Sequence, residues 1–190
     1  MNQRSVPKSK ILKVALDLFS SNGYSGTKMS EIARDVGISV GAFYLRFKSK
    51  QELCLELIKD QTKDFKELTK NLSTKDPLKA LNTYITLNLN YAFQKRQLLS
   101  IFIREHKLPF IQSLKRDFFK TQHKIIRDIL IAGVKKGVFS SMNCKDTASM
   151  IFASIRGAIL LKLVFRVGNV RDMSKSLFNL ITNGIRRGVS

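Results

Sequence analysis

Apolar residues recur every three or four positions along most of the chain, which is the period of an α-helix that buries one face. A first helix is expected from about Pro7 to Gly23, because proline suits an opening turn and glycine ends the run. Its apolar face consists of Ile11, Ala15, Leu18 and Phe19. Clusters of β-branched residues, which are typical of strands, are sparse. The pattern therefore predicts an all-α fold.

Two short helices are expected next. The first follows Thr27, its expected N-cap, and places on one face Met29, Ile32, Ala33 and Val36. Gly37 suits the left-handed residue that ends such a helix. After one more residue, Ser39 can cap a second short helix that buries Phe43 and Phe47. A short helix, a tight turn and another short helix form a helix-turn-helix pattern.

Six further helices are expected, over approximately residues 50–72, 77–93, 96–106, 110–136, 144–165 and 171–186. Ser49 can cap the fourth helix, Asp76 and Pro77 form a start signal for the fifth, and Asn143 with Asp146 resembles a capping box for the eighth. The predicted organisation is a three-helix head, residues 1–48, which the long fourth helix joins to a larger helical body, residues 49–190.

The chain is strongly basic, with 34 Lys and Arg against 14 Asp and Glu and a formal net charge of +20. Such a charge favours a polyanionic partner, which can be nucleic acid, an anionic membrane surface or acidic metabolites. Residues 1–50 hold 9 basic and 3 acidic residues, and residues 51–190 hold 25 and 11. Because the excess is spread over head and body, charge raises the expectation of DNA binding without identifying the partner.

Cysteine usage and hydropathy favour a cytoplasmic protein. Cys54 and Cys144 lack the CxxC spacing and lie in helical patterns, which indicates reduced thiols. The most apolar later segment, residues 148–165, contains Arg156 and Lys162. A buried helix is therefore favoured over a membrane span, and no membrane partner is expected.

Catalysis has no support in the sequence, and the chain is not expected to be an enzyme. It contains no nucleophile elbow, phosphate-binding glycine loop or paired-carboxylate signature. His106 and His123 lack companions at metal-ligand spacing, so neither a metal nor a cofactor is expected. Besides a DNA-binding regulator, two alternatives stay open. A basic helical protein that binds lipid or membrane surfaces would bind vesicles without operator preference, and a small-molecule enzyme would show turnover.

The residues of the helix-turn-helix make the pattern specific. Residues 15–53 contain, without gaps, Gly23-Tyr24-x-Gly26-Thr27, Ile32-Ala33, Gly37-Ile38-Ser39, Gly41, Tyr44 and Phe47-Lys48-Ser49-Lys50. With these spacings the segment, about a fifth of the chain, resembles the DNA-binding head of the TetR family of transcriptional regulators. The resemblance implies a dimeric repressor that binds double-stranded operator DNA and is released by a small-molecule effector.

The resemblance also implies roles for single positions. Phosphate contacts are implied for Thr27, Ser39, the backbone near Ala42, Tyr44, Lys48 and Lys50. Base-facing positions are Val40, Gly41 and Leu45. Ala42 stands where the family often has Thr, which removes a side-chain contact. Arg46 stands where His or an aromatic residue is usual, and it could grip phosphate or read guanine. Thr27 and Ser39 could instead serve only as caps, and Lys48 and Lys50 only as solvated cations.

In this family the last two helices form the homodimer and the middle helices bind the effector. Apolar stripes that suit such a dimer include Met150, Ile151, Ile155, Ile159, Val164, Leu177 and Leu180, although a core helix has the same pattern. Candidate effector residues are Phe102, Phe118, Phe152 and Arg156. Arg156 is a cation within an apolar helix and needs a partner. That partner could be an anionic effector or a structural acid such as Glu105 or Asp128.

Overall fold

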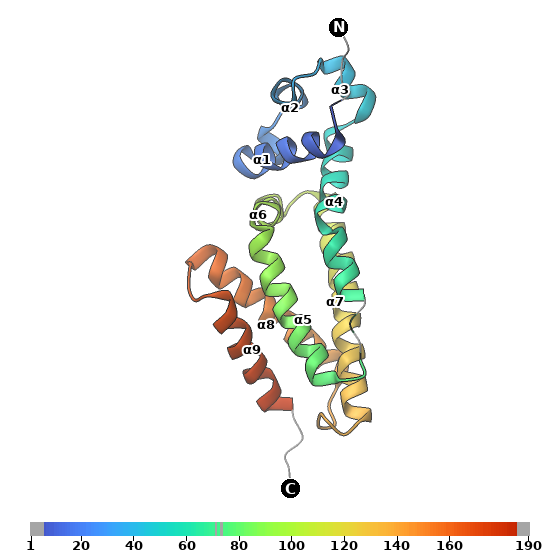
Figure 1. The fold of residues 1–190 in the computed structure, drawn as a ribbon, viewed down its shortest axis with the longest axis vertical. Coiled ribbons are helices and arrows are strands. Elements are labelled where there is room, and N and C mark those ends of the chain that lie inside the picture. The colour runs from blue at the N-terminus through green and yellow to red at the C-terminus, as the bar shows by residue number, and fades with distance from the viewer. Residues whose placement is uncertain (1–5, 71, 73, 186–190) are drawn as a thin grey trace. The chain divides into compact units, whose positions relative to one another are not determined.

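A computed structural model describes residues 6–70, 72 and 74–185, and over these ranges the fold is all-α, as the periodicity predicts (Figure 1). The helices are α1 (Lys8–Gly26), α2 (Met29–Val36), α3 (Val40–Arg46), α4 (Lys50–Lys70), α5 (Pro77–Gln94), α6 (Arg96–Arg104), α7 (Pro109–Lys135), α8 (Cys144–Phe165) and α9 (Val170–Ile185). Every predicted helix is present. The expected end of the last helix at Arg186 lies outside the described residues.

Local capping signals explain where several helices begin and end. The Ser39 hydroxyl accepts a hydrogen bond from the Ala42 amide at 3.2 Å, and the Ser49 hydroxyl accepts one from Glu52 at 3.1 Å. The Asn143 side chain accepts bonds from the first amides of α8. Gly37 ends α2 with a φ of 85°, a left-handed conformation that suits glycine. These caps agree with the sequence-based predictions.

By its internal contacts the chain divides into two compact units. Unit 1 consists of residues 1–64 and 95–111, and unit 2 of residues 65–94 and 112–190. In unit 1, α6 packs against α1, which also packs against α2. In unit 2, α5 packs against α8 and α9. The predicted division into residues 1–48 and 49–190 concerns function and stays a prediction, since the contacts define a different division.

Each unit has its own apolar core. The core of unit 1 includes Ile11, Phe19, Ile32, Val36, Phe43, Leu53, Leu57 and Ile101. The core of unit 2 includes Leu81, Tyr84, Leu89, Ile126, Leu130, Phe139, Ile151 and Ile155. Its packing is tight where α7 ends, because a Cβ atom added at Gly133 would lie 2.0 Å from the Phe139 ring. The core of unit 1 holds the short helices α2 and α3 in place, and the core of unit 2 supports a cluster of aromatic side chains that includes Phe118 and Phe152.

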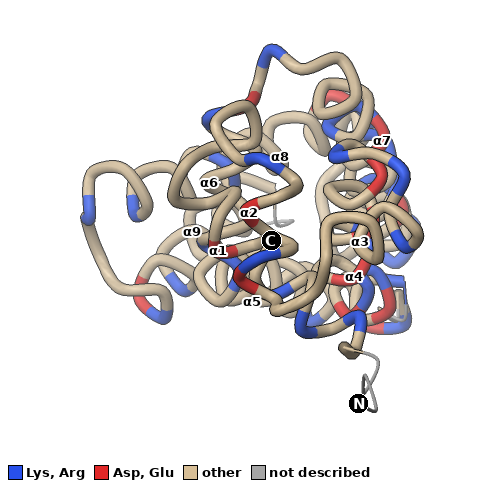
Figure 2. Tube along the Cα trace, turned by 90° about the horizontal axis from the view of Figure 1, so that it is seen from above, with Lys and Arg blue, Asp and Glu red and all other residues tan. Residues whose placement is uncertain are grey.

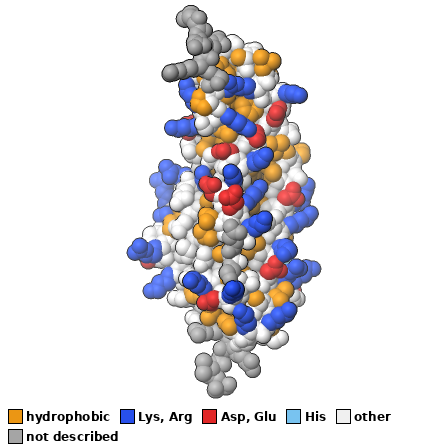
Figure 3. Space-filling model, turned by 45° about the vertical axis from the view of Figure 1, so that its right-hand side comes forward, with side chains coloured by type: hydrophobic (Ala, Val, Ile, Leu, Met, Phe, Trp, Pro, Cys, Tyr) orange, Lys and Arg blue, Asp and Glu red, His pale blue; other side chains and the backbone are white. Residues whose placement is uncertain are grey.

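Lys and Arg residues are distributed along the described part of the Cα trace (Figure 2). The face drawn in Figure 3 likewise carries many Lys and Arg side chains and fewer acidic ones. Within the described ranges, ion pairs join Lys8 and Lys59 to Glu56, Arg34 to Asp35, and Lys124 to Asp128. Acidic residues are too few to pair with most of the basic ones. The surface therefore attracts polyanions over long range.

Candidate nucleic-acid interface

Helix α3 presents a short exposed face that buried aromatic residues hold in place. Phe43 and Phe47 are buried, with ring centroids 5.8 Å apart, and α2 packs against α3. The opposite face of α3 is exposed: Val40, Gly41, Tyr44, Leu45 and Arg46. Leu45 has 89% of its surface exposed, and neither it nor Val40 carries a polar side chain. The base-facing and phenolic positions of the predicted site are thus available to a partner.

The start of α3 matches the predicted cap, with one restriction. Ser39 is exposed, and its hydroxyl accepts the Ala42 amide proton. That amide is therefore already used within the helix, so a phosphate contact through the backbone at Ala42 would compete with the cap. Lys48 follows α3 with an exposed side chain, while its amide donates to the Glu52 carboxylate at 2.7 Å.

Thr27 is not the N-cap of α2. Its side chain is fully buried, and its hydroxyl donates hydrogen bonds to the carbonyls of Gly23 at 2.8 Å and Leu18 at 3.2 Å. The N-cap of α2 is Lys28, whose amide donates to the Glu31 carboxylate at 2.9 Å. The prediction that Thr27 caps α2 is wrong. Its hydroxyl closes the end of α1 and is turned away from solvent.

Lys50 also makes contacts that the sequence did not reveal. Its ammonium group donates to the carbonyls of Tyr24 at 2.7 Å, Ser25 at 3.3 Å and Thr27 at 2.9 Å. It also lies 4.6 Å from the centroid of the Tyr24 ring. A lysine has three protons to donate, and three carbonyls at the end of α1 accept them. In this arrangement Lys50 fixes the turn before α2 and has no proton left for a phosphate.

Glu105, which follows α6, also binds the turn before α2. Its carboxylate accepts a hydrogen bond from the Tyr24 amide at 2.9 Å. Gly23 has a φ of 80°, and a Cβ atom there would lie 2.9 Å from the Glu105 carboxylate, so glycine fits both the backbone and the space. The neighbouring Arg104 donates to the Ser21 carbonyl at 3.0 Å. Glu105 could not be found from local pattern, because its partner is 81 residues away in the chain.

Burial and charge shift two titratable groups beside this turn. Burial and, after it, the Glu105 carboxylate raise the pKa of the Cys54 thiol, Lys50 lowers it, and the resulting pKa is about 12. Burial also raises the pKa of Tyr24, followed by its electrostatic interactions with Cys54 and Glu105. Both groups therefore stay neutral at physiological pH.

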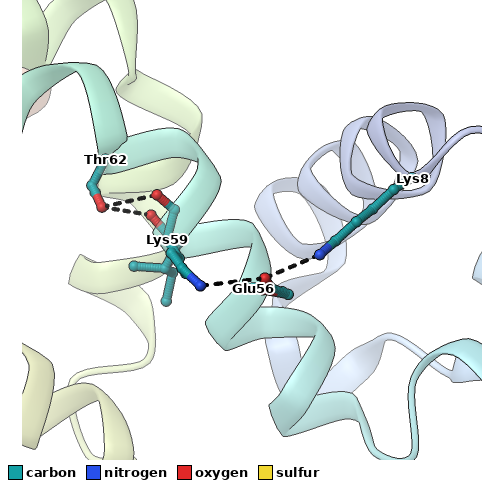
Figure 4. Close-up of polar contacts among 5 residues, drawn as sticks. Lys8, Glu56, Lys59 and Thr62 are labelled. Carbon is teal, nitrogen blue, oxygen red and sulfur yellow. Dashed lines mark hydrogen bonds and ion pairs between the residues drawn. The ribbon is translucent and has the colours of Figure 1, made fainter.

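A second set of contacts joins α1 to α4. The side chains of Lys8 and Lys59 point to Glu56 from the two helices, at 3.0 Å and 3.9 Å (Figure 4). The hydrogen bond from Lys8 is the main cause of the lowered pKa of Glu56. Arg46 donates to the carbonyl of Val6, so this guanidinium holds the chain before α1 as well as facing solvent.

The candidate effector residues fall in both units. Phe118, Phe152 and Arg156 are together in unit 2, with the Arg156 guanidinium carbon 5.0 Å and 5.6 Å from the two ring centroids. Phe102 lies on α6 in unit 1, and the described ring contacts do not include it. Neither structural acid pairs with Arg156: Glu105 binds the Tyr24 amide, and Asp128 pairs with Lys124 at 2.7 Å.

Two other sequence-based expectations concern metals and membranes. Among the described residues, no three His, Cys, Asp or Glu side chains are grouped to hold a metal ion, and His123 contacts the Lys145 carbonyl. Over the same residues, α8 alone is long and apolar enough to cross a membrane, a test that core helices of soluble proteins also pass. The expectation that α8 is buried is only partly met. Ile151, Ile155 and Ile159 are buried, whereas Met150, Leu160, Leu161 and Val164 are exposed.

Helices α2 and α3 form a helix-turn-helix module, and the chain is therefore of the class of helical proteins that carry such a module. Residues 11–57 match the model of the bacterial regulatory proteins of the tetR family. The chain is 30% identical over 145 residues to YerO, an uncharacterized HTH-type transcriptional regulator of Bacillus subtilis; this match covers 73% of the chain and 49% of YerO. The chain thus spans about half the length of that relative.

Two further similarities extend over nearly the whole chain. The fatty acid metabolism regulator protein of Bacillus subtilis is 23% identical over 97% of this chain and 98% of its own length. A TetR transcription regulator from Haloarcula marismortui has the same fold, with a TM-score of 0.80, 15% identity and coverage of 95% of this chain and 98% of the other. The chain belongs to the TetR family of helix-turn-helix transcriptional regulators.

Proposed function

We propose that the chain is a repressor that binds a near-palindromic operator in double-stranded DNA as a homodimer and is released when a small apolar or anionic effector binds its body. The observation that carries this proposal is the exposed face of α3 within the segment that matches the family model. In such modules the second helix enters the major groove, and two copies bind half-sites about 34–36 Å apart.

In the proposed interface, different residues recognise the bases and bind the phosphates. Val40, Gly41 and Leu45 would face base edges, where Val40 and Leu45 can contact only apolar groups such as thymine methyls. Ser39, the start of α3 near Ala42, Tyr44, Arg46 and Lys48 would contact phosphates. For Thr27 and Lys50 the proposed role is indirect, since both are bonded within the protein and shape the turn that positions α2.

The exposed sides of α8 and α9 support a dimer interface. Met150, Leu160, Leu161 and Val164 on α8 and Leu180 on α9 have between 45% and 72% of their surface exposed. Such a concentration of apolar surface on two neighbouring helices is typical of a site that a partner covers. Ile155, by contrast, is 1% exposed and belongs to the core of its own chain. A dimer-breaking substitution should therefore be placed at Leu160 or Leu180.

An effector site in the body is supported by the aromatic cluster around Arg156 and by the similarity to a fatty acid metabolism regulator. A regulator of that metabolism would respond to molecules with an apolar chain and an anionic group. The effector needs only to bind the conformer that does not fit DNA more tightly than the one that does. Operator DNA must then weaken effector binding by the same factor.

The proposal is tested by selecting DNA sequences bound by the purified chain and measuring affinity by fluorescence anisotropy. A symmetric sequence bound by two chains is the expected result. Leu180→Glu should give monomers in light scattering and lose operator affinity, whereas Leu68→Glu, at an exposed leucine of α4, should stay dimeric. If the wild-type chain selected no sequence and bound anionic vesicles instead, the alternative of a membrane-surface protein would replace the repressor.

A further inference from the structure

Arg156 is a half-buried cation without an acidic partner. It lies on α8, and among the described residues no ion pair or hydrogen bond of its guanidinium group is found. Its contacts are with the faces of Phe118 and Phe152, at 5.0 Å and 5.6 Å. Aromatic faces stabilise a cation only partly, because they do not replace the hydrogen bonds that water gives up.

A second cation lies close to the first. Lys115 on α7 is exposed, and its pKa is lowered by burial and then by the positive charge of Arg156, so the two cations lie within electrostatic range of each other. Two like charges near each other disfavour their charged forms, and an anion between them would offset this repulsion. No carboxylate is among the groups that shift the pKa of Lys115 or Arg156.

Tyr84 does not neutralise these charges either. It is fully buried and donates its phenolic proton to the Gln122 side chain at 2.9 Å. Burial raises its pKa, and the hydrogen bond with Asn88 and the charge of Arg156 only partly oppose this, so the phenol stays neutral. Neither of these cations therefore has a compensating acidic group among the interactions described, and an anion from outside the chain would supply one.

Aromatic side chains extend from this pair. Phe152 contacts Phe119 at 5.1 Å and Phe118 at 6.4 Å between ring centroids, and Phe118 contacts Phe65 at 6.1 Å. Phe119 has 40% of its surface exposed. A positive pair next to partly exposed aromatic rings matches a molecule that has an anionic group at one end and an apolar remainder.

We propose that Arg156 and Lys115 bind the anionic head, a carboxylate or phosphate, of an amphipathic effector whose apolar part packs against Phe118, Phe119 and Phe152. This inference rests on the proposed function and names its effector class. Arg156 can bind either head through two parallel hydrogen bonds. A cationic head would be repelled by the charges of Arg156 and Lys115, so the site disfavours cationic amphiphiles.

Calorimetry on the full chain tests the site with three probes that share one tail: decanoate, decyl phosphate and decyltrimethylammonium, each below its micellar concentration. We expect both anions to bind and the cation to bind at least tenfold more weakly. The ratio of the decanoate and decyl phosphate affinities identifies the preferred head. Absence of binding by both anions at millimolar concentration, or equal affinity for the cation, would overturn the proposal.

Variants assign the effect to the named residues. Arg156→Gln should weaken anion binding at least tenfold and Lys115→Gln several-fold, whereas Lys120→Gln, which removes an exposed charge from the same helix, should leave it unchanged. Circular dichroism monitors the folding of each variant. If Arg156→Gln does not fold, the anion affinities of Arg156→Lys and Lys115→Gln test the assignment instead. Equal affinities in wild type, Arg156→Gln and Lys115→Gln would contradict the assignment.

A separate arm distinguishes this inference from the proposed function. The affinity for a selected operator is measured with and without saturating decanoate or decyl phosphate. Anion binding that depends on Arg156 but leaves operator affinity unchanged would keep the site and refute its role in release. A chain that binds no operator at all would refute the proposed function, while calorimetry would still decide the anion site.

Discussion

Lys50 in unit 1 and Arg156 in unit 2 are both cations next to aromatic rings, yet their surroundings differ. Lys50 lies 4.6 Å from the Tyr24 ring centroid and donates to three carbonyls, whereas Arg156 lies 5.0 Å from the Phe118 centroid and has no such acceptor. A cation whose donors are all used is part of the fold. A cation whose donors lack protein partners is available to a ligand. The comparison thus separates a structural charge from the charge that we propose to bind a ligand.

The largest expected effect is that of Lys50→Met, which leaves three carbonyls at the end of α1 without their donor. Unfilled acceptors of this kind cost about 1–3 kcal/mol of folding free energy. Urea unfolding should show that loss, and operator binding should weaken for every sequence without a change in its salt dependence. Lys48→Met is the matched control: its stability should be unchanged, and its salt slope should be flatter by about one unit. A Lys50→Met protein that behaved like this control would make Lys50 a phosphate contact.

The rate at which the Cys54 thiol reacts is a second measure of the state of the turn before α2. Its pKa of about 12 leaves about a thousandfold less thiolate at pH 8 than an ordinary thiol, so it should react very slowly with a thiol reagent. The raised pKa also means that its contribution to stability is intact below the ordinary thiol pKa and is lost as the pH rises toward 12. In a Cys144→Ser background, Lys50→Met should accelerate the labelling of Cys54. Unchanged labelling would show that the turn does not depend on Lys50.

Arg156→Met should have the opposite outcome to Lys50→Met. Replacing a half-buried cation without a partner by an apolar side chain removes a desolvation cost and breaks no hydrogen bond. We expect the free energy of unfolding to stay within about 1 kcal/mol of wild type or to rise. A loss as large as that of Lys50→Met in the same urea titration would mean that both cations are structural.

The smallest effect concerns base reading. Replacing thymine by uracil where Val40 or Leu45 contacts the operator removes one methyl group, worth about 0.8 kcal/mol or about fourfold in Kd. Leu45→Ala should reduce this discrimination at its own contact and leave the salt dependence unchanged. If uracil and thymine operators bound wild type equally well at every position, α3 would read the sequence through something other than methyl groups.

Local features of the fold could be predicted from the sequence, because their causes lie within a few residues. Ser39, Gly37 and Asn143 end or begin helices as expected. Thr27 and Lys50 were assigned by position in a motif, and their actual partners could not be derived from it. The Lys50 ammonium reaches a carbonyl 26 residues earlier, and Glu105 reaches an amide 81 residues earlier.

The aromatic cluster near Arg156 and the apolar residues of α8 and α9 also show what cannot be predicted from the sequence. Periodicity marked α8 as apolar, but a helix with apolar residues on more than one side does not reveal which side faces its own chain. Ile155 is in the core and Leu160 is exposed, although both fit an apolar stripe. Arg156 stands out in the sequence as a charge that needs a partner, while Lys115, an ordinary lysine in a basic chain, has no distinguishing signal.

The proposed base-facing residues of α3, Val40, Gly41 and Leu45, have no polar side-chain atoms, which has a consequence for the temperature dependence of DNA binding. Phosphate contacts act through charge, whereas burial of methyl groups against Val40 and Leu45 depends on the hydrophobic effect, which weakens on cooling. Operator discrimination should therefore decline in the cold before overall DNA affinity does. Specific binding should also carry a more negative heat-capacity change than binding to random DNA.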